Sequence, residues 1–130
     1  FEQLRPYQRE GVAWMWKLHH TDSGSGGLLA DEMGLGKTVQ ACAFIHAART
    51  SGARHALVLV PVTLIKQWMK EVKHWCPGCP VYVYHGTAKQ RQVALEGIKK
   101  AKGGVLLTSY ALFKGKGEGK GAEPLMNVAL

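Results

Sequence analysis

The sequence has few cysteines, few acidic residues and no long apolar run. Three cysteines in 130 residues are too few for a disulfide-dense secreted scaffold, and they favour a reducing compartment. Uninterrupted apolar runs such as residues 56–60 are far shorter than the roughly 20 residues that span a bilayer. The first residues, FEQLRPYQRE, are polar and charged, unlike a secretory signal. We therefore expect neither a membrane-spanning nor a secreted scaffold protein.

Acidic residues number only 9 against 17 Lys and Arg, so the net charge is +8 and the pI is about 9.6. This excess predicts a polyanionic partner, nucleic acid first. Residues 87–120 carry eight of the cations and two of the acids. That segment is either a solvated helix face followed by a soluble linker, or a surface that contacts DNA.

The composition is otherwise that of one globular domain. Hydrophobic residues make up 46% and charged residues 20% of the chain, which excludes a disordered acidic tail, a collagen-like chain and a coiled coil. The chain begins at Phe1 and stops inside the apolar stretch PLMNVAL. We therefore expect it to be a piece of a longer protein.

Apolar strands alternate with helical patterns along the chain, which predicts βαβ units and a mostly parallel sheet with helices on both faces. The sequence predicts helices over 6–20, 37–49, 63–75, 87–102 and, at the end of this series, 109–113. It predicts strands over 27–30, 56–60, 81–85 and 104–108. In such a sheet the ligand-binding residues gather at the carboxyl ends of the strands.

The strongest motif is GLLADEMGLGKT at residues 27–38, in which a predicted strand enters a glycine-rich turn and then a helix. This is the context that a phosphate-binding loop requires. Gly34 and Gly36 let the backbone approach an anion, and successive N–H groups face it at the helix N-terminus. Lys37 would reach the β- and γ-phosphates, and the Thr38 hydroxyl would coordinate Mg²⁺. A chance glycine-rich turn would not combine the strand, both glycines, the Lys and the Thr.

Several motifs together resemble one family, the SWI/SNF-type DNA translocases of the superfamily 2 helicase-like ATPases. DEMGLGKT resembles motif I of that family. LRPYQREGVAWMW resembles its adenine-recognition Q motif, LVLVPVTLIKQWMKEVKHW its motif Ia, and VLLTSYALF its motif Ib, and YHG matches a segment between the last two. The motifs stand in the family's order, are closest to the Cockayne syndrome B and mitotic translocase subgroup, and extend to about residue 114.

The resemblance implies two RecA-like lobes that close on ATP and walk along one strand of duplex DNA, in a nuclear protein. This chain would form most of the first lobe, a three-layer α/β unit with a mostly parallel sheet that is incomplete at its C-terminus. Residues 1–113 would be the lobe, 114–124 a Gly/Lys-rich linker or insertion, and 125–130 a truncated continuation.

The family's nucleotide-binding residues carry over to particular positions of this chain. Gln8 would read the adenine, with Arg5 or Tyr7 close by, and Lys37 and Thr38 would hold the phosphates and Mg²⁺. The full set of nucleotide-binding residues implied is Gln8, Met33, Gly34, Leu35, Gly36, Lys37 and Thr38.

The resemblance also implies contacts to the DNA phosphate backbone, from Thr63 and Lys66 in motif Ia and from Thr108 and Ser109 in motif Ib. From the residues alone, Thr63 follows a strand and can cap the next helix, and the same holds for Thr108 and Ser109. Helix capping without DNA contact is therefore the alternative interpretation of both sites.

Hydrolysis requires an apolar strand that ends in Asp-Glu, which orients Mg²⁺ and the attacking water. Asp31 and Glu32 follow the strand predicted over 27–30, but they lie inside the phosphate loop and cannot play that part, and no other predicted strand ends in this pair. We therefore expect this chain alone to bind nucleotide weakly without turning it over, although the parent would be a DNA-dependent ATPase. The alternatives are a different P-loop enzyme, which would need its own catalytic carboxylate, and a non-catalytic nucleic-acid or protein-binding module. Gly36, Lys37 and Thr38 are all present, which argues against a phosphate loop that has lost its function.

Cys76-Pro77-Gly78-Cys79 is a C-x-x-C segment with three interpretations. It could be half of a zinc knuckle with His74 and His85, or a redox pair. A plain turn is the favoured interpretation, because only one further cysteine, Cys42, exists in the chain.

Overall fold

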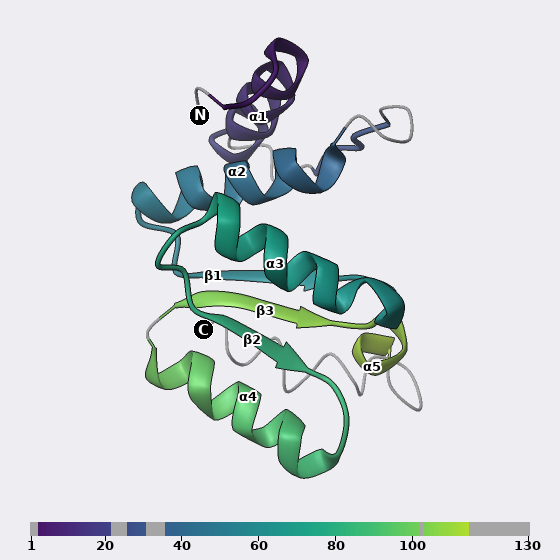
Figure 1. The fold of residues 1–130 in the computed structure, drawn as a ribbon. Coiled ribbons are helices and arrows are strands. Elements are labelled where there is room, and N and C mark those ends of the chain that lie inside the picture. The colour runs from purple at the N-terminus through teal and green to yellow at the C-terminus, as the bar shows by residue number, and fades with distance from the viewer. Residues whose placement is uncertain (1–2, 22–25, 31–35, 102, 115–130) are drawn as a thin grey trace.

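The computed structural model describes residues 3–21, 26–30, 36–101 and 103–114 (Figure 1). None of the helices within these ranges combines the length and the apolar character that crossing a bilayer requires. The elements are, in chain order, α1 (Pro6–His19), α2 (Lys37–Thr50), β1 (His55–Leu59), the 3₁₀ turn η1 (Val62–Leu64), α3 (Ile65–Trp75), β2 (Val81–Tyr84), α4 (Ala88–Lys100), β3 (Gly104–Thr108) and α5 (Tyr110–Lys114).

The three strands form a parallel sheet in the order β1-β3-β2. Leu106 of β3 lies opposite Leu57 on one side and Tyr82 on the other. All five residues of β3 are buried, as expected for the apolar run GVLLT when it forms the middle strand of a parallel sheet. The predicted parallel α/β fold is thus confirmed, and the predicted bounds of β3 are the observed ones.

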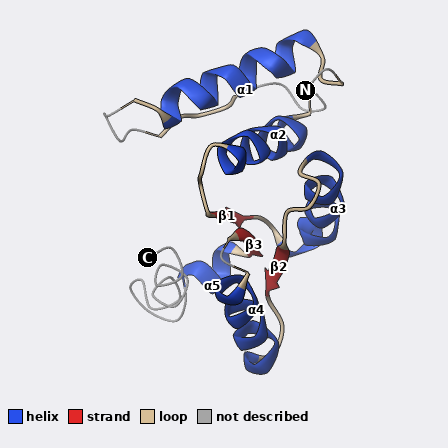
Figure 2. Cartoon of the chain, turned by 90° about the vertical axis from the view of Figure 1, so that its left-hand side faces the viewer, coloured by secondary structure: helices blue, strands red, loops and turns tan. Residues whose placement is uncertain are grey.

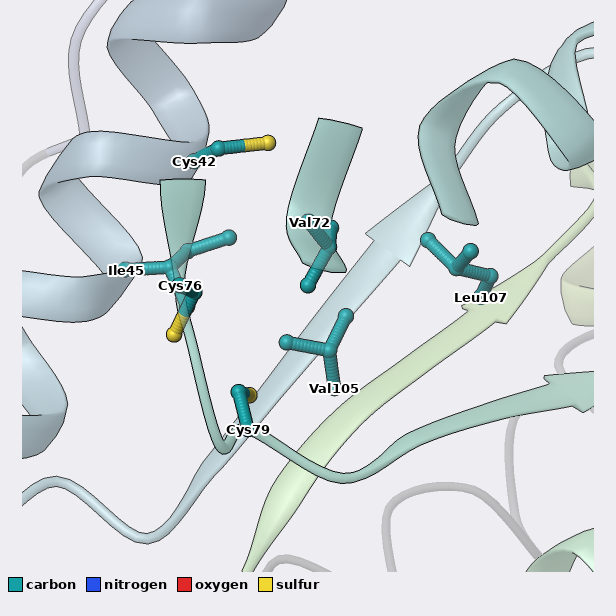
Figure 3. Packing of buried hydrophobic residues seen from close by; sticks show 7 residues of the cluster. All are labelled: Cys42, Ile45, Val72, Cys76, Cys79, Val105 and Leu107. Atoms are coloured by element: carbon teal, nitrogen blue, oxygen red, sulfur yellow. The ribbon is translucent and has the colours of Figure 1, made fainter. Parts of the chain in front are cut away.

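Helices cover both faces of the sheet, because successive side chains of β3 point to opposite sides. Figure 2 shows α4 on one side of the strands, and α3, α2 and α1 stacked beyond the other. On the first side Leu106 packs with Tyr84, Ala94, Leu95 and Ile98. On the second side the buried cluster is Cys42, Ile45, Val72, Cys76, Cys79, Val105 and Leu107 (Figure 3).

Helix α4 shows how a local sequence signal sets a boundary. Thr87 accepts a hydrogen bond at Oγ1 from the Gln90 N–H (3.2 Å), and the Gln90 side-chain oxygen accepts one from the Thr87 N–H (2.9 Å). This reciprocal capping satisfies two backbone donors that the first turn would leave free. The helix therefore starts one residue after Thr87, within the predicted range 87–102.

The strand predicted over 27–30 is wrong, because the described residues 26–30 form no regular secondary structure. Leu28 is 84% exposed there, so the apolar side chains do not enter a sheet. Among the strands that the structure describes, none pairs with this segment or with the outer edge of β1. An extended segment without a neighbouring strand has no partner for its backbone N–H and C=O groups.

An apolar cavity of about 350 Å³ lies between α2 and the outer edge of β1. Phe44 and Ala48 line it from the helix, and Leu57 and Val58 line it from the strand. Helix α2 therefore reaches the sheet mainly through α3 and the shared cluster rather than by covering β1. Segment 26–30 lies beside α1 instead, where Gly27 faces Trp14 and Leu18.

The start of α3 differs from the predicted start at residue 63. The Leu64 N–H bonds to the Pro61 carbonyl (2.9 Å) and closes η1, so Thr63 lies within a 3₁₀ turn and is exposed. The N-cap of α3 is Leu64, with no side-chain capping bond. The prediction that Thr63 caps this helix is therefore wrong, and its hydroxyl stays on the surface.

Candidate functional site

Helix α2 begins at Lys37, as the phosphate-loop motif predicts. Its N-cap, Gly36, has φ 76° and ψ 45°, a left-handed conformation that glycine adopts without steric cost. Helical hydrogen bonding starts at this N-cap, where the Gln40 N–H bonds to the Gly36 carbonyl (3.1 Å). The first N–H groups of α2 are thus available to an anion beside Lys37 and Thr38. The implied residues Met33, Gly34 and Leu35 lie outside the described residues.

Gln8 on α1 lies directly against this loop. Its side chain is 9% exposed, and its amide nitrogen occupies the space that a Cβ on Gly36 would fill. Its Oε1 accepts a hydrogen bond from the Arg5 N–H (2.9 Å), which fixes the side chain at the helix start. The structure therefore brings together two residues that the family resemblance implies for adenine and phosphate, from different helices. Arg5 is exposed and Tyr7 half-buried at the same helix end.

The start of α2 opens into a cavity of about 510 Å³. Gly36, Lys37, Thr38 and Val39 line one side of it, and the other side is formed by Leu64, Gln67 and Glu71. Sequence reasoning missed the second wall. Gln67, Glu71 and Trp75 recur every four residues, and this spacing was the available signal that one face of α3 is polar.

The residues implied for DNA contact divide into exposed and buried pairs. Thr63 and Lys66 are exposed at the N-terminal end of α3. Thr108 is fully buried and donates its hydroxyl to the Tyr84 carbonyl (2.8 Å), and Ser109 is 4% exposed. The Ser109 hydroxyl accepts a bond from the Leu112 N–H (3.3 Å), so the capping predicted for Ser109 is present.

The segment after β1 and the segment after β3 meet at the carboxyl-terminal end of the sheet. The Val60 N–H bonds to the Thr108 carbonyl (2.9 Å), which joins the chain after β1 to the end of β3. Parallel strands force their carboxyl ends to the same side, and the N-terminal ends of α2 and α3 lie on that side as well (Figure 1). The phosphate-loop helix and the implied DNA-contact segments therefore share one face of the molecule.

The C-x-x-C segment forms a turn whose two cysteines are buried in the apolar core, while Pro77 and Gly78 are exposed. The Cys79 N–H bonds to the Cys76 carbonyl (3.1 Å), and Gly78 supplies φ 75°. Cys42 joins the two cysteines from α2, and all three are free thiols (Figure 3). Within the described ranges, no three or more His, Cys, Asp or Glu side chains are placed to hold a metal ion.

The chemistry of these thiols agrees with a structural role. Burial, the nearby charge of Glu71 and the neighbouring thiols raise the pKa of Cys42 to about 12. Burial and the hydrogen bond with Cys79 likewise raise the pKa of Cys76 to about 12, against a lowering effect of Arg49. The thiolate is the metal ligand and the nucleophile, and these pKa values suppress it at neutral pH. The plain turn is the interpretation that the structure favours.

The cations expected after residue 87 are on the surface where the structure describes them. Lys89, Lys99 and Lys100 are exposed on α4. Arg91 instead lies over the Tyr84 ring, with its guanidinium carbon 5.9 Å from the ring centroid. Lys102, Lys116 and Lys120 lie outside the described residues. The choice between a solvated helix face and a DNA-contact surface thus stays open.

The sequence is similar to large chromatin and repair proteins. It is 41% identical over 114 residues to "DNA excision repair protein ERCC-6-like" of Danio rerio, covering 86% of this chain and 8% of the relative. It is 43% identical over 89 residues to "DNA excision repair protein CSB" of Oryza sativa, covering 68% of this chain and 7% of the relative. The chain thus spans less than a tenth of the length of these two relatives.

Among solved structures, the fold is similar to the "Sulfolobus solfataricus SWI2/SNF2 ATPase core in complex with dsDNA", with a TM-score of 0.72 and 30% identity. The match covers 88% of this chain and 23% of that one. Residues 7–126 match the family described as the SNF2-related domain, and this match contains the α1 glutamine, the phosphate-loop helix and both edge segments. The chain belongs to the SNF2-related domain family.

Proposed function

We propose that this chain supplies the ATP-binding residues of a nuclear DNA-dependent ATPase that translocates along duplex DNA. The observation that carries the proposal is the contact of Gln8 with Gly36 at the start of α2. An adenine-reading amide and a phosphate-binding helix end must lie side by side to hold one nucleotide, and these two do.

The residues at the start of α2 fit Mg²⁺-ATP. The first N–H groups of α2 can bind an anion, Lys37 supplies a cation, and the Thr38 hydroxyl is a hard oxygen ligand of the kind Mg²⁺ prefers. Bound Mg²⁺ would neutralise charge on the phosphates. The neighbouring cavity of about 510 Å³ is open to the same residues.

We place the DNA on the face that the carboxyl ends of the strands share with the start of α3. Thr63 and Lys66 are exposed and would contact phosphates directly. Thr108 and Ser109 have buried side chains, and their hydrogen bonds shape the edge at which β3 ends. Their contact to DNA would therefore pass through backbone groups. Such binding would be independent of sequence and sensitive to salt.

Nucleotide titration of the full chain against Lys37→Ala tests the first part. Lys37 is exposed, so its removal should leave the thermal midpoint unchanged. Affinity for Mg²⁺-ATP should fall by at least about tenfold, because a charge-assisted hydrogen bond contributes about 1.5–3 kcal/mol. Equal affinity of the two proteins would contradict the proposal.

Phosphate release by residues 1–130 alone tests the second part. We expect no DNA-stimulated turnover, because the one Asp-Glu pair of the sequence, residues 31–32, lies inside the phosphate-loop motif and cannot serve as the acidic pair that hydrolysis uses. Robust turnover that Lys37→Ala abolishes would overturn this expectation and leave the ATP-binding proposal standing.

Lys66→Glu tests the DNA face separately. Affinity for duplex DNA should fall for every sequence, and the dependence of log affinity on log salt should weaken by about one ion. The matched control is Lys99→Glu at the C-terminal end of α4, which precedes β3 and so lies at the amino ends of the strands, away from the proposed contact. Equal losses for both variants would argue for diffuse charge attraction rather than a defined site.

A further inference from the structure

The acidic side of the cavity at the start of α2 has no role in the nucleotide binding proposed above. Glu71 is the acidic residue among the described residues that line the cavity, and it lies across from the start of α2. A carboxylate facing a polyphosphate repels it unless a cation lies between the two. Its presence in this wall therefore needs a physical reason.

A hydrogen bond from a packed tryptophan holds Glu71 in place. Its Oε2 accepts a hydrogen bond from the indole N–H of Trp75, one turn later in α3, at 3.1 Å. Trp75 itself packs against the buried cluster, so the indole is a fixed donor. The side chain of Glu71 is half-buried and lines the cavity, and its Oε1 takes no part in the Trp75 bond.

The position of Glu71 relative to α2 follows from two independent observations. It shares the lining of the cavity with Thr38, and its negative charge acts on the buried thiol of Cys42. Thr38 and Cys42 are four residues apart and so lie on the same face of α2. Glu71 therefore faces the side of the helix that carries the hydroxyl implied for Mg²⁺.

We propose that Glu71, oriented by Trp75, forms an acidic wall of the nucleotide site that makes binding depend on a divalent cation. With Mg²⁺ present, the carboxylate attracts the cation or its bound water next to Thr38. Without it, the carboxylate repels the phosphates. Gln67, one turn earlier on the same face of α3, adds a neutral amide to the wall and does not contribute to this dependence. The inference rests on the proposed nucleotide binding.

The test measures ATP affinity of the full chain twice, with Mg²⁺ and with EDTA, by competition against a fluorescent nucleotide. The readout is the ratio of the two affinities, which needs no turnover. In Glu71→Gln, affinity in EDTA should rise and affinity in Mg²⁺ should fall, so that the ratio drops about tenfold. Trp75→Phe keeps the ring and removes the donor, and it should lower the ratio by about threefold.

Controls separate the possible failures. Glu96→Gln removes an exposed carboxylate of α4 that bonds to Gln92 (3.2 Å), and it should leave the ratio unchanged. Circular dichroism checks that each variant is folded. If Glu71→Gln does not fold, the affinity ratio of Trp75→Phe provides the test. A wild-type ratio in both cavity variants overturns the role of Glu71 while Lys37→Ala still supports nucleotide binding. Absence of any nucleotide binding by the wild type overturns both proposals.

Discussion

The sheet with its two covering helices contrasts with the α1–α2 pair at the N-terminal end. Every residue of β3 is buried and hydrogen-bonded between two neighbours, and Val105 and Leu107 have no exposed surface. In the N-terminal pair Trp14 is 38% exposed, Leu28 is 84% exposed, and the segment 26–30 has no strand partner among the described strands.

The residues that stabilise the fold and the residues implied for nucleotide binding thus lie mostly in different regions. The sheet region buries the apolar surface that drives folding, while the residues implied for nucleotide binding lie on α1 and at the start of α2. Helix α2 belongs to both regions, since its later residues Cys42 and Ile45 enter the buried cluster. Changes in the sheet should therefore alter stability, and changes at the start of α2 should alter binding first.

The largest effect is expected for Leu107→Ala in the middle strand. Leu107 is fully buried in the cluster that joins β3 to α2 and α3, and its truncation leaves a cavity. The free energy of unfolding should fall by about 3 kcal/mol in a urea titration. The control from the N-terminal region is Leu28→Ala, which should change it by less than about 0.5 kcal/mol. Equal losses would erase the contrast between the two regions.

Gly36→Ala tests the contact between α1 and the start of α2 within the N-terminal region. Alanine is strained at φ 76°, and its Cβ would collide with the Gln8 amide, so we expect a loss of about 1–2 kcal/mol of stability. Nucleotide affinity should fall together with stability. Gly26→Ala has open space around it and should change neither property. A well-folded Gly36→Ala protein with wild-type affinity would show that the contact with Gln8 is dispensable.

Thr108→Val probes a single buried hydrogen bond inside the sheet. The isosteric change removes the donor to the Tyr84 carbonyl and leaves that oxygen unsatisfied, which should cost about 1 kcal/mol in thermal or urea unfolding. Thr63→Val, on the exposed 3₁₀ turn, should leave stability unchanged. If the two substitutions cost the same, the Thr108 bond does not stabilise the sheet edge.

The smallest effect is the contribution of the Cys42 thiol to alkaline sensitivity. Its pKa is about 12 in the folded protein and 9.0 as a free group, so the fold favours the neutral thiol. That stabilisation is complete below pH 9 and is lost as pH rises from about 9 toward 12, because the unfolded chain ionises first. Between pH 7 and 9, wild-type stability should fall more than that of Cys42→Ala, by at most about 0.4 kcal/mol. An identical pH profile would contradict the effect of burial.

Most elements of the sheet region could be predicted from local sequence. The run GVLLT has the bounds of β3, and the Thr87–Gln90 spacing marks the start of α4. The pattern over 27–30 is just as apolar, yet it forms no strand, because a strand also needs a neighbour to bond to. The start of α3 differs from its prediction for another reason: the 3₁₀ turn closed by the Pro61 carbonyl takes the place of capping by Thr63.

The sequence by itself determined the family, the parallel α/β class and the residues that can bind phosphate, because glycines, Lys and Thr act through their order along the chain. Only the tertiary structure decided which distant side chains meet. It placed Gln8 on Gly36, set Glu71 opposite Thr38 and buried the Thr108 hydroxyl inside the sheet. These are contacts between elements, and their geometry follows from how α1, α2 and α3 pack, which no local pattern encodes.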